Sequence, residues 1–522
     1  MTPPKQAGAT ASAPGARPAA SHLLAFAIEA MRGKVIGGVV PGDGHFAGAA
    51  FDSRAVRPGE LFFALSGEHV DGFDYCVAAA RAGAAALVVD ARRGVPAALL
   101  DQAGAALTIP VIGVPDPLAA LADLARALRA RFSGRVVGIT GSNGKTTTRE
   151  LTAAALGAFG SVLRTQGNYN TEIGLPLTII GAPGGEDFWV LEMAMRGRGQ
   201  IALLAEIARP HVGVITNVAG AHVELLGSIE EVARAKGELF AALGPGGVAI
   251  FPARDPLIEA EAAHISEKQK LRFEGSRREP TPSSATGRAA DVVDVVILET
   301  LPAGLAGQVV RYAVREVPVV ARLPLGGVHN ARNGAAALAV AAALGLSLPE
   351  AARALAHTVL PSHRSFPTAV AGRVILDDCY NANPASMRAA VASVVAATGG
   401  WRGFRGGRGG GAGRPFAILG DMLELGPDTV ALHREVGREA GRQLAGLVTV
   451  GALGAEIASG ARESGLAAER AVAVETPAAA AALVARWSRP GDWILVKASR
   501  GMRLERAIDA LGEEFRNQPA MT

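Results

Sequence analysis

A lysine and a row of threonines follow a glycine-rich turn in the first third of the chain. The stretch T-G-S-N-G-K-T-T, residues 140–147, comes directly after the apolar run 136–139. Glycines let backbone N–H groups face phosphate oxygens, and the N-terminus of the helix that follows adds partial positive charge. Lys145 can reach the β- and γ-phosphates, and the Thr146 hydroxyl can bind Mg²⁺. The pattern predicts a nucleotide phosphate site, although Ile139 stands where the common P-loop motif has its first glycine; a glycine turn with an incidental lysine is the less favoured alternative.

Two further residue types could bind a metal ion near such a site. Glu192 lies inside an otherwise apolar run, where a carboxylate is costly unless it is paired or bound to a metal. It could therefore be a Mg²⁺ ligand, or the ion-pair partner of Arg196 or Arg198. His222 follows an expected strand, and parallel sheets bind ligands beyond the carboxyl ends of their strands. A lone histidine is more often structural, so both roles stay open for His222.

A dense polar cluster, D-D-C-Y-N-A-N-P at 377–384, lies between an expected strand and an expected helix. Asn383 before Pro384 suits the start of a helix, where side-chain oxygens accept hydrogen bonds from backbone N–H groups. Two aspartates and two asparagines exceed that requirement, so a ligand site is also indicated. The stretch K-A-S-R-G at 497–501 follows another strand and suits a ligand or a simple turn equally. Lys236, within an expected helix, has the pattern of a solvated surface lysine.

The elements that must position these groups alternate between apolar strands and helical runs. Such alternation predicts an α/β fold whose sheets are mainly parallel, with helices on both faces. For 522 residues we expect about three domains. Asp116-Pro117 opens a helix before the first boundary, as N-cap and first-turn residue. The predicted segments are a disordered tail at 1–22, a smaller N-terminal α/β domain at 23–132, a central P-loop-type domain at 133–365 and a C-terminal Rossmann-like α/β domain at 366–518.

Composition argues against several classes of protein. With 49% apolar and 19% charged residues, the chain can form large cores. The net charge of +4 equals the four arginines of the Gly/Arg-rich segment 399–414, so no general basic face for nucleic acid is indicated. The longest apolar run, 335–348, is too short to cross a bilayer, and the first 22 residues lack the apolar core of a signal peptide. Cys76 and Cys379 suggest no disulfide framework, which fits a reducing cytosol. We expect 399–414 to be a flexible insert and 266–290 to be a solvent-exposed excursion.

Taken in order, these motifs resemble those of the Mur ligases and their folylpolyglutamate synthase relatives. The phosphate loop is similar to the family's T-G-[TS]-N-G-K-[TS], and 377–384 is similar to the D-D-x-Y-N-A-N-P signature of one of its branches. The resemblance extends from about residue 50 to 505. His363 departs from it, because the family often has glycine before the arginine at 364. Further similar stretches are N-Y-N-T-E-I-G at 168–174, H-N-A-R-N at 329–333, G-D-M-L-E-L-G at 420–426 and K-A-S-R-G-M at 497–502.

The resemblance implies a role for each matched residue. Lys236 looks like the family's carbamylated lysine, an anionic group near the metal, and the catalytic set would be Lys145, Lys236 and His222. Magnesium would be bound by Thr146, Glu192 and His222. ATP would be held by Gly141, Ser142, Asn143, Gly144, Lys145, Thr146, Thr147, Asn330, Asn333, Arg364 and Asp378. The UDP end of the substrate would contact Ser53 and Arg54, its muramoyl part Asn168, Asn170, Thr171 and Arg196, and the dipeptide Asn381 and Asn383.

The activity implied by the resemblance is that of an ATP-dependent, ADP-forming peptide ligase with Mg²⁺ as cofactor. It would join D-alanyl-D-alanine to UDP-N-acetylmuramoyl-tripeptide through an acyl phosphate, giving the UDP-muramoyl-pentapeptide precursor of the cell wall. A cytoplasmic monomer is expected, without nucleic acid or membrane insertion. One alternative is another Mur-type or folylpolyglutamate ligase; against it stand the 377–384 cluster and the absence of an Asp-Asn-Pro-Arg motif. The other is a nucleic-acid-binding protein that uses the Gly/Arg segment, which is short and isolated.

Overall fold

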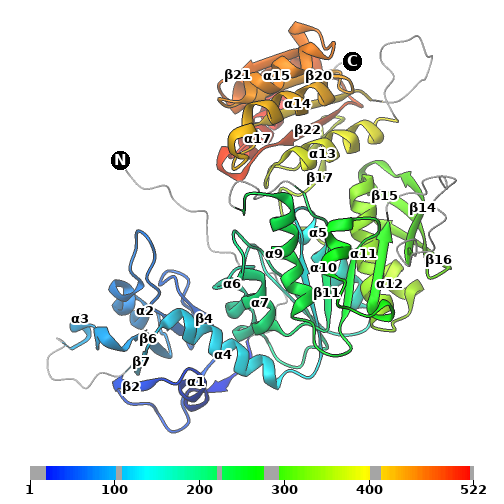
Figure 1. Cartoon of the computed structure of the whole chain (residues 1–522). Helices are drawn as coiled ribbons and strands as arrows, with labels where there is room; N and C mark the ends of the chain where they lie inside the picture. Colours follow the sequence, from blue (N-terminus) through cyan, green and yellow to red (C-terminus); the bar gives the residue numbers. More distant parts are fainter. Residues whose placement is uncertain (1–18, 101–108, 220–225, 275–292, 400–412, 518–522) are drawn as a thin grey trace. The chain divides into compact units, whose positions relative to one another are not determined.

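The structure, a computed structural model, describes residues 19–100, 109–219, 226–274, 293–399 and 413–517. Helices alternate with strands along the chain (Figure 1), and the strands form sheets of two, five, nine and six members. The predicted α/β class is confirmed. The chain divides into two compact units, which are Met1–Gly138 with Gly160–Ala194 and Gln200–Pro210, and Ile139–Phe159 with Met195–Gly199 and His211–Thr522. The boundaries of the three predicted domains stay a prediction.

The N-terminal segment forms a five-stranded sheet in the order β2-β7-β6-β5-β4, parallel except for β2. Helix α4 begins as predicted, because the Asp116 side chain accepts from the N–H of Leu118 and Pro117 occupies the first turn. The strands are β1 (His22–Leu23), β2 (Lys34–Gly37), β3 (His45–Phe46), β4 (Ala49–Ala50), β5 (Leu61–Phe63), β6 (Ala86–Asp90) and β7 (Val111–Val114). The helices are α1 (Leu24–Ala30), η1 (Gly72–Tyr75), α2 (Cys76–Arg81), η2 (Ala91–Arg93), α3 (Ala97–Leu100) and α4 (Pro117–Arg131).

The central sheet has nine strands in the order β16-β15-β14-β13-β12-β11-β8-β10-β9. Pairing is parallel from β11 to β14, and an antiparallel meander of β14, β15 and β16 ends the sheet. The strands are β8 (Arg135–Thr140), β9 (Val162–Arg164), β10 (Phe188–Glu192), β11 (Val212–Ile215), β12 (Val248–Pro252), β13 (Lys270–Glu274), β14 (Val295–Pro302), β15 (Gln308–Val314) and β16 (Val317–Leu323). The helices are α5 (Lys145–Gly157), α6 (Gly174–Ile180), α7 (Gln200–Ala208), α9 (Ile229–Ala241), α10 (Pro256–Glu261), η3 (Glu267–Gln269), η5 (Gly304–Ala306), α11 (Val328–Ala343), α12 (Leu348–Ala354) and η6 (Leu355–His357).

The expected solvent-exposed excursion at 266–290 is wrong for its first part. Residues 270–274 form strand β13, which lies inside the sheet between β12 and β14. Leu271 and Phe273 are buried, and so are the charged Lys270 and Arg272 that alternate with them. The charged residues made this segment look exposed in the sequence. The Arg272 charge is neutralised within the fold, because its Nε donates to Glu259 at 3.0 Å. The remainder, 275–290, lies outside the described residues.

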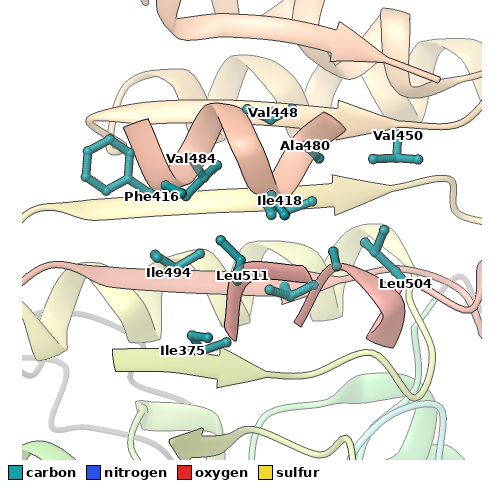
Figure 2. Close-up of a cluster of buried hydrophobic side chains, with 14 of the residues drawn as sticks. Ile375, Phe416, Ile418, Val448, Val450, Ala480, Val484, Ile494, Leu504 and Leu511 are labelled. Atoms are coloured by element: carbon teal, nitrogen blue, oxygen red, sulfur yellow. The ribbon is translucent and has the colours of Figure 1, made fainter. Parts of the chain in front are cut away.

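The third sheet has the order β17-β18-β22-β19-β20-β21, parallel except for the edge strand β17. Neighbouring residues of one strand point to opposite faces, so Ile375 lies on the face covered by α16 and α17 (Figure 2), whereas Leu376 lies on the face covered by α13, α14 and α15. The strands are β17 (Phe366–Val370), β18 (Arg373–Asp377), β19 (Pro415–Gly420), β20 (Gly446–Val450), β21 (Ala471–Val474) and β22 (Trp493–Lys497). The helices are α13 (Pro384–Ala397), η7 (Gly426–Asp428), α14 (Thr429–Gly441), α15 (Gly454–Glu463), η8 (Ala468–Arg470), α16 (Pro477–Trp487), η9 (Arg500–Met502) and α17 (Glu505–Asn517).

This topology places the polar motifs of the third sheet together. Strands β18, β22 and β19 are adjacent and parallel, so their carboxyl ends share one edge. Those ends lead into the stretches at 377–384, 497–501 and 420–426. Most of the Gly/Arg segment, 400–412, lies outside the described residues. Across the described ranges, no helix is both long and apolar enough to cross a bilayer.

Candidate functional site

The phosphate loop connects the buried strand β8 to helix α5, as predicted. Gly141 has φ +146°, and a Cβ on it would lie 1.9 Å from the Thr216 hydroxyl oxygen. Gly144 has φ +79°, and its Cβ would lie 2.6 Å from Oδ1 of Asn333. Both positions therefore need glycine twice over, for the backbone angle and for the close approach of a neighbour. The turn itself therefore requires these glycines, and the phosphate role of the loop stays a prediction.

Side chains from the end of β11 support this loop from one side. The N–H of Asn143 donates to Oδ1 of Asn217 at 3.0 Å, and the Asn143 carbonyl accepts from Asn217 Nδ2 at 2.9 Å and from Thr216 Oγ1 at 2.6 Å. The N–H of Ser142 donates to the Asn217 carbonyl at 2.9 Å. The sequence did not predict a role for Asn217 or Thr216. Each lies some 75 positions from Asn143 in the chain, and no local pattern shows that the two segments meet.

The start of α5 has the chemistry of a phosphate site. No side chain caps the helix at Gly144, so its positive N-terminal end faces the loop. Lys145 Nζ donates to the Gly141 carbonyl at 2.7 Å, which places the ammonium over the turn. Thr146 is buried and Thr147 is half-buried. These groups fit a nucleotide phosphate, which pairs with a helix N-terminus and a lysine.

Helix α11 braces the same loop through two asparagines. Asn330 and Asn333 are buried, and Asn333 Nδ2 donates to Asn330 Oδ1 at 3.2 Å. Thr148 Oγ1 donates to Asn333 Oδ1 at 3.3 Å, beside Gly144. Asn333 thus lies against the phosphate loop and α5, and Asn330 contacts Asn333. Their contact with ATP stays a prediction.

Lys236 differs from the solvated lysine that its helix suggested. It lies on the buried side of α9, and its side chain is only 1% exposed. Burial, and then the nearby charge of Lys145, lower the pKa of Lys236 well below its usual range. A neutral amine is the form that reacts with carbon dioxide, so this environment suits the predicted carbamate.

The structure describes two of the three predicted metal ligands, Thr146 and Glu192. Glu192, at the end of β10, is 2% exposed, and its Oε1 accepts from Asn170 Nδ2 at 2.8 Å. Its backbone N–H donates to Thr165 Oγ1 at 2.9 Å. His222 lies outside the described residues. Within the described part of the chain, no group of three or more histidine, cysteine, aspartate or glutamate side chains could hold a metal ion. Mg²⁺ often takes one or two carboxylates together with phosphate oxygens, and the roles of Glu192 and Thr146 as its ligands stay a prediction.

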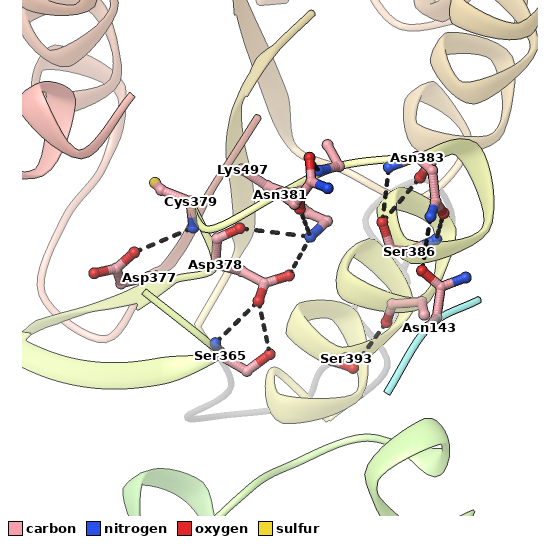
Figure 3. Close-up of polar contacts among 12 residues, drawn as sticks. Asn143, Ser365, Asp377, Asp378, Cys379, Asn381, Asn383, Ser386, Ser393 and Lys497 are labelled. Carbon is pink, nitrogen blue, oxygen red and sulfur yellow. Dashed lines mark hydrogen bonds and ion pairs between the residues drawn. The ribbon is translucent and has the colours of Figure 1, made fainter. Parts of the chain in front are cut away.

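The polar cluster after β18 is held by a buried lysine (Figure 3). Lys497 Nζ donates to Asp378 Oδ2 at 2.5 Å and to the Asn381 carbonyl at 2.8 Å. Oδ1 of Asp378 accepts from the backbone N–H of Ser365 at 3.0 Å. The predicted residues Asp378 and Asn381 are therefore brought together. Lys497, which the sequence left undecided between a turn and a ligand, is the ion that joins them.

A second contact ties the end of β19 into the same edge. The N–H of Ser499 donates to the Asp421 carbonyl at 3.1 Å, and the N–H of Leu423 donates to Ser499 Oγ at 2.9 Å. His433 fixes this loop from α14, because its Nε2 accepts from the N–H of Met422 at 2.9 Å while Nδ1 donates to a carbonyl. Sequence similarity had singled out 420–426 without giving these residues roles.

Arg364 lies beside the same cluster. Its guanidinium stacks over the Tyr380 ring at 3.7 Å from the centroid. His363, where the family often has glycine, has φ +65°, a backbone angle that glycine adopts without strain. The imidazole Nδ1 lies 2.7 Å from Asp377 Oδ2, and the Tyr380 N–H donates to the His363 carbonyl at 3.0 Å. The departure from the family pattern is thus accommodated by local contacts.

The remaining predicted substrate residues lie on surfaces or at turns. Arg54 is exposed and pairs with Asp52 at 2.6 Å, next to the half-buried Ser53. Asn168 and Thr171 are exposed in the turn before α6, and Arg196 is exposed after β10. Their contact with substrate stays a prediction.

Three segments of the chain match known domain families. They are "Mur ligase family, catalytic domain" at residues 45–129, "Mur ligase middle domain" at 139–341 and "Mur ligase, glutamate ligase domain" at 364–500. A relative from Mycobacterium tuberculosis (strain ATCC 25618 / H37Rv), named UDP-N-acetylmuramoyl-tripeptide--D-alanyl-D-alanine ligase, is 37% identical over 88% of this chain and 91% of its own length. A relative of the same name from Bacillus subtilis (strain 168) is 34% identical over 89% of this chain and 93% of its own length.

Solved structures are similar over the whole fold. A crystal structure of MurF from Acinetobacter baumannii covers 95% of this chain and 100% of its own, with a TM-score of 0.77 and 26% identity. The crystal structure of MurF ligase from Thermotoga maritima in complex with ADP covers 91% of this chain and 99% of its own, with a TM-score of 0.72 and 26% identity.

Proposed function

The chain belongs to the Mur ligase family, and we propose that it joins D-alanyl-D-alanine to UDP-N-acetylmuramoyl-tripeptide with conversion of ATP to ADP. The observation that carries this proposal is the phosphate loop, with its two required glycines and the Lys145 ammonium over the turn. The similarity of the chain, along most of its length, to ligases of that name supports the proposal. The ADP complex of the Thermotoga maritima relative supports nucleotide binding by the shared fold.

The first step activates the carboxylate of the tripeptide. A carboxylate oxygen attacks the γ-phosphorus, the bond from phosphorus to the ADP oxygen breaks, and an acyl phosphate forms. Charge on the transferring group is spread over its oxygens, so preorganised positive groups stabilise the transition state. Lys145 and the N-terminus of α5 supply such groups at the loop.

The second step forms the amide. The neutral amine of the dipeptide attacks the acyl carbon, the tetrahedral intermediate collapses, and phosphate leaves while the amine loses a proton. Asn381, whose carbonyl accepts from the buried Lys497 at the edge of the third sheet, would approach the dipeptide, because a side-chain amide can both donate and accept. Arg364, stacked on Tyr380, would approach the nucleotide from the same edge.

Thr146 and Glu192 would hold Mg²⁺ together with the nucleotide, and the ion would neutralise phosphate charge. Lys236 is proposed as a carbamate beside it. Its burial and lowered pKa favour the neutral amine that carbamylation needs. Lys236→Arg keeps a positive charge where an anion is required and should be no more active than Lys236→Ala. An active Lys236→Arg enzyme would exclude the carbamate.

We also propose that the chain acts as a cytoplasmic monomer. Cys76 and Cys379 are free and buried, as a reducing compartment allows. Light scattering on the purified chain tests the oligomeric state, and a stable dimer at working concentration would overturn it.

Isotope transfer tests the proposed chemistry directly. The substrate tripeptide is labelled with ¹⁸O in its reacting carboxylate and turned over with ATP and D-alanyl-D-alanine. An acyl phosphate carries one carboxylate oxygen away with phosphorus, so mass spectrometry should find the label in inorganic phosphate. Unlabelled phosphate, or AMP and pyrophosphate in place of ADP, would refute the mechanism.

A further inference from the structure

The side chain of Asn143 leaves the phosphate loop and meets the start of helix α13 (Figure 3). Its Oδ1 accepts a hydrogen bond from Nδ2 of Asn383 at 2.7 Å. The backbone N–H and carbonyl of Asn143 are already bonded to Asn217, and the carbonyl also to Thr216. The backbone is thus fixed on one side, and the side-chain amide is the part that reaches the helix.

Asn383 is fixed just as firmly. Its Oδ1 accepts from the N–H of Ser386 at 2.9 Å, and its own N–H donates to Ser386 Oγ at 2.9 Å, which together form a capping box at α13. Because the oxygen of the amide faces the helix, the Nδ2 group must face away from it. That orientation is the one that presents a donor to Asn143.

The residue type supports a second role. Serine, threonine or aspartate would cap α13 as well as asparagine does. Of these four residues, asparagine alone has an N–H₂ group left to donate once its oxygen caps the helix. Capping uses the Asn383 oxygen, and the contact with Asn143 uses its N–H₂ group.

Both partners belong to stretches that are themselves held in place. Just before Asn383, the carbonyl of Ala382 accepts from Ser499 Oγ at 3.3 Å, and that of Asn381 accepts from Lys497. A shift of the phosphate loop at Asn143 would therefore be transmitted directly to the edge of the third sheet where strands β18, β22 and β19 end.

We propose that Asn383 is a positioning residue that couples the phosphate loop to the edge that receives the acceptor, through its hydrogen bond to Asn143. The proposal rests on the proposed function, because it takes the loop as the nucleotide site. It revises the expectation that Asn383 serves the dipeptide directly. The bond holds the loop in a binding-ready shape, and it makes nucleotide affinity depend on α13.

The test is a double-mutant cycle on the full chain. Asn383→Ser keeps a capping oxygen but is too short to reach Asn143, and Asn143→Ala removes the acceptor. Ser386→Ala is the matched control, because it weakens the capping box and leaves the Asn143–Asn383 pair intact. For each variant, calorimetry gives the dissociation constant of Mg·ADP, and thermal unfolding gives stability.

Each single change at the pair should weaken Mg·ADP binding about two- to tenfold, the range of a neutral hydrogen bond. The double variant should be no weaker than the worse single variant, since both changes remove the same bond. Ser386→Ala should lower the melting temperature and leave ADP affinity within about twofold, as a change that spares the bond should.

Three outcomes would overturn the coupling role. The first is a double variant whose loss of Mg·ADP affinity equals the product of the two single losses. The second is a wild-type affinity in Asn383→Ser. The third is a loss of affinity in Ser386→Ala as large as that in Asn383→Ser. Failure of the proposed function is a separate result. A wild-type chain that binds Mg·ADP but makes no product with D-alanyl-D-alanine refutes the acceptor, and the cycle still decides the coupling. A wild-type chain that binds no nucleotide refutes both.

Discussion

Replacing Lys236 by methionine should stabilise the protein at neutral pH, and the gain should shrink as the pH rises. The lysine is buried, and its pKa in the folded state is lowered well below 10.5 by burial and by Lys145. Between the folded pKa and 10.5 the unfolded chain binds a proton that the folded chain does not. Wild-type stability therefore rises with pH through this window, by at most roughly 1.4 kcal/mol per pH unit. Methionine has no proton to bind, so the variant lacks this slope.

The assay is urea unfolding of wild type and Lys236→Met at steps between neutral pH and about pH 10. Buffers free of carbon dioxide keep the amine from forming a carbamate. Lys270→Met is the matched control, because Lys270 is also buried but pairs with Glu267 at 2.7 Å. Because the Lys270 charge is already paired, Lys270→Met should bring no such stabilisation at neutral pH.

The reasoning about Lys236 would be refuted by parallel stability curves for wild type and Lys236→Met. It would also fail if Lys236→Met were the less stable protein at neutral pH. Parallel curves would mean that the folded protein binds the Lys236 proton as well as the unfolded chain does. A less stable variant would mean that burying the amine costs less than the contacts that methionine fails to make.

Three other substitutions test the loop and the third sheet. Lys145→Ala should lower the rate of ADP formation by about a hundredfold or more, because a preorganised charge at the phosphoryl group is lost. The circular dichroism spectrum should stay that of wild type. Gly141→Ala should lower the free energy of unfolding in urea by about 2–6 kcal/mol, from backbone strain and overpacking against Thr216. Adding Thr216→Ala should restore part of that loss, and strictly additive losses would contradict the clash. Lys497→Met should cost about 3–5 kcal/mol, since it leaves the Asp378 carboxylate without its cation, and a loss below about 1 kcal/mol would mean that water replaces the lysine.

The phosphate loop could be predicted from sequence because its signal is local. Glycines, lysine and threonines follow one another directly after an apolar strand. The role of each residue type depends only on this one turn and on the helix that follows it. Asn383 was likewise predictable as a helix cap, since Asn-Pro before a helical run has that meaning by itself. The strands that precede 377–384 and 497–501 were predictable because each is a short apolar run.

Contacts between distant segments could not be predicted in this way. Asn217 supports Asn143, and Asn143 meets Asn383, only because the sheets bring their strand ends together. The burial of Lys236 depends on which side of α9 faces the core, which one lysine in a mixed helix does not reveal. Strand β13 was missed because its charged residues are paired to partners that lie outside it in sequence.

The most direct test of the proposed function is a competition among acceptors. The full chain is given ATP, Mg²⁺, UDP-N-acetylmuramoyl-tripeptide and an equal mixture of D-alanyl-D-alanine, meso-diaminopimelate, L-lysine and glutamate, and the products are weighed by mass spectrometry. The predicted result is one product, heavier than the tripeptide substrate by the dipeptide less water, with one ADP released for each molecule formed. A product that carries a single amino acid would contradict the assignment of the acceptor, and ADP release without any new amide would contradict the ligase itself.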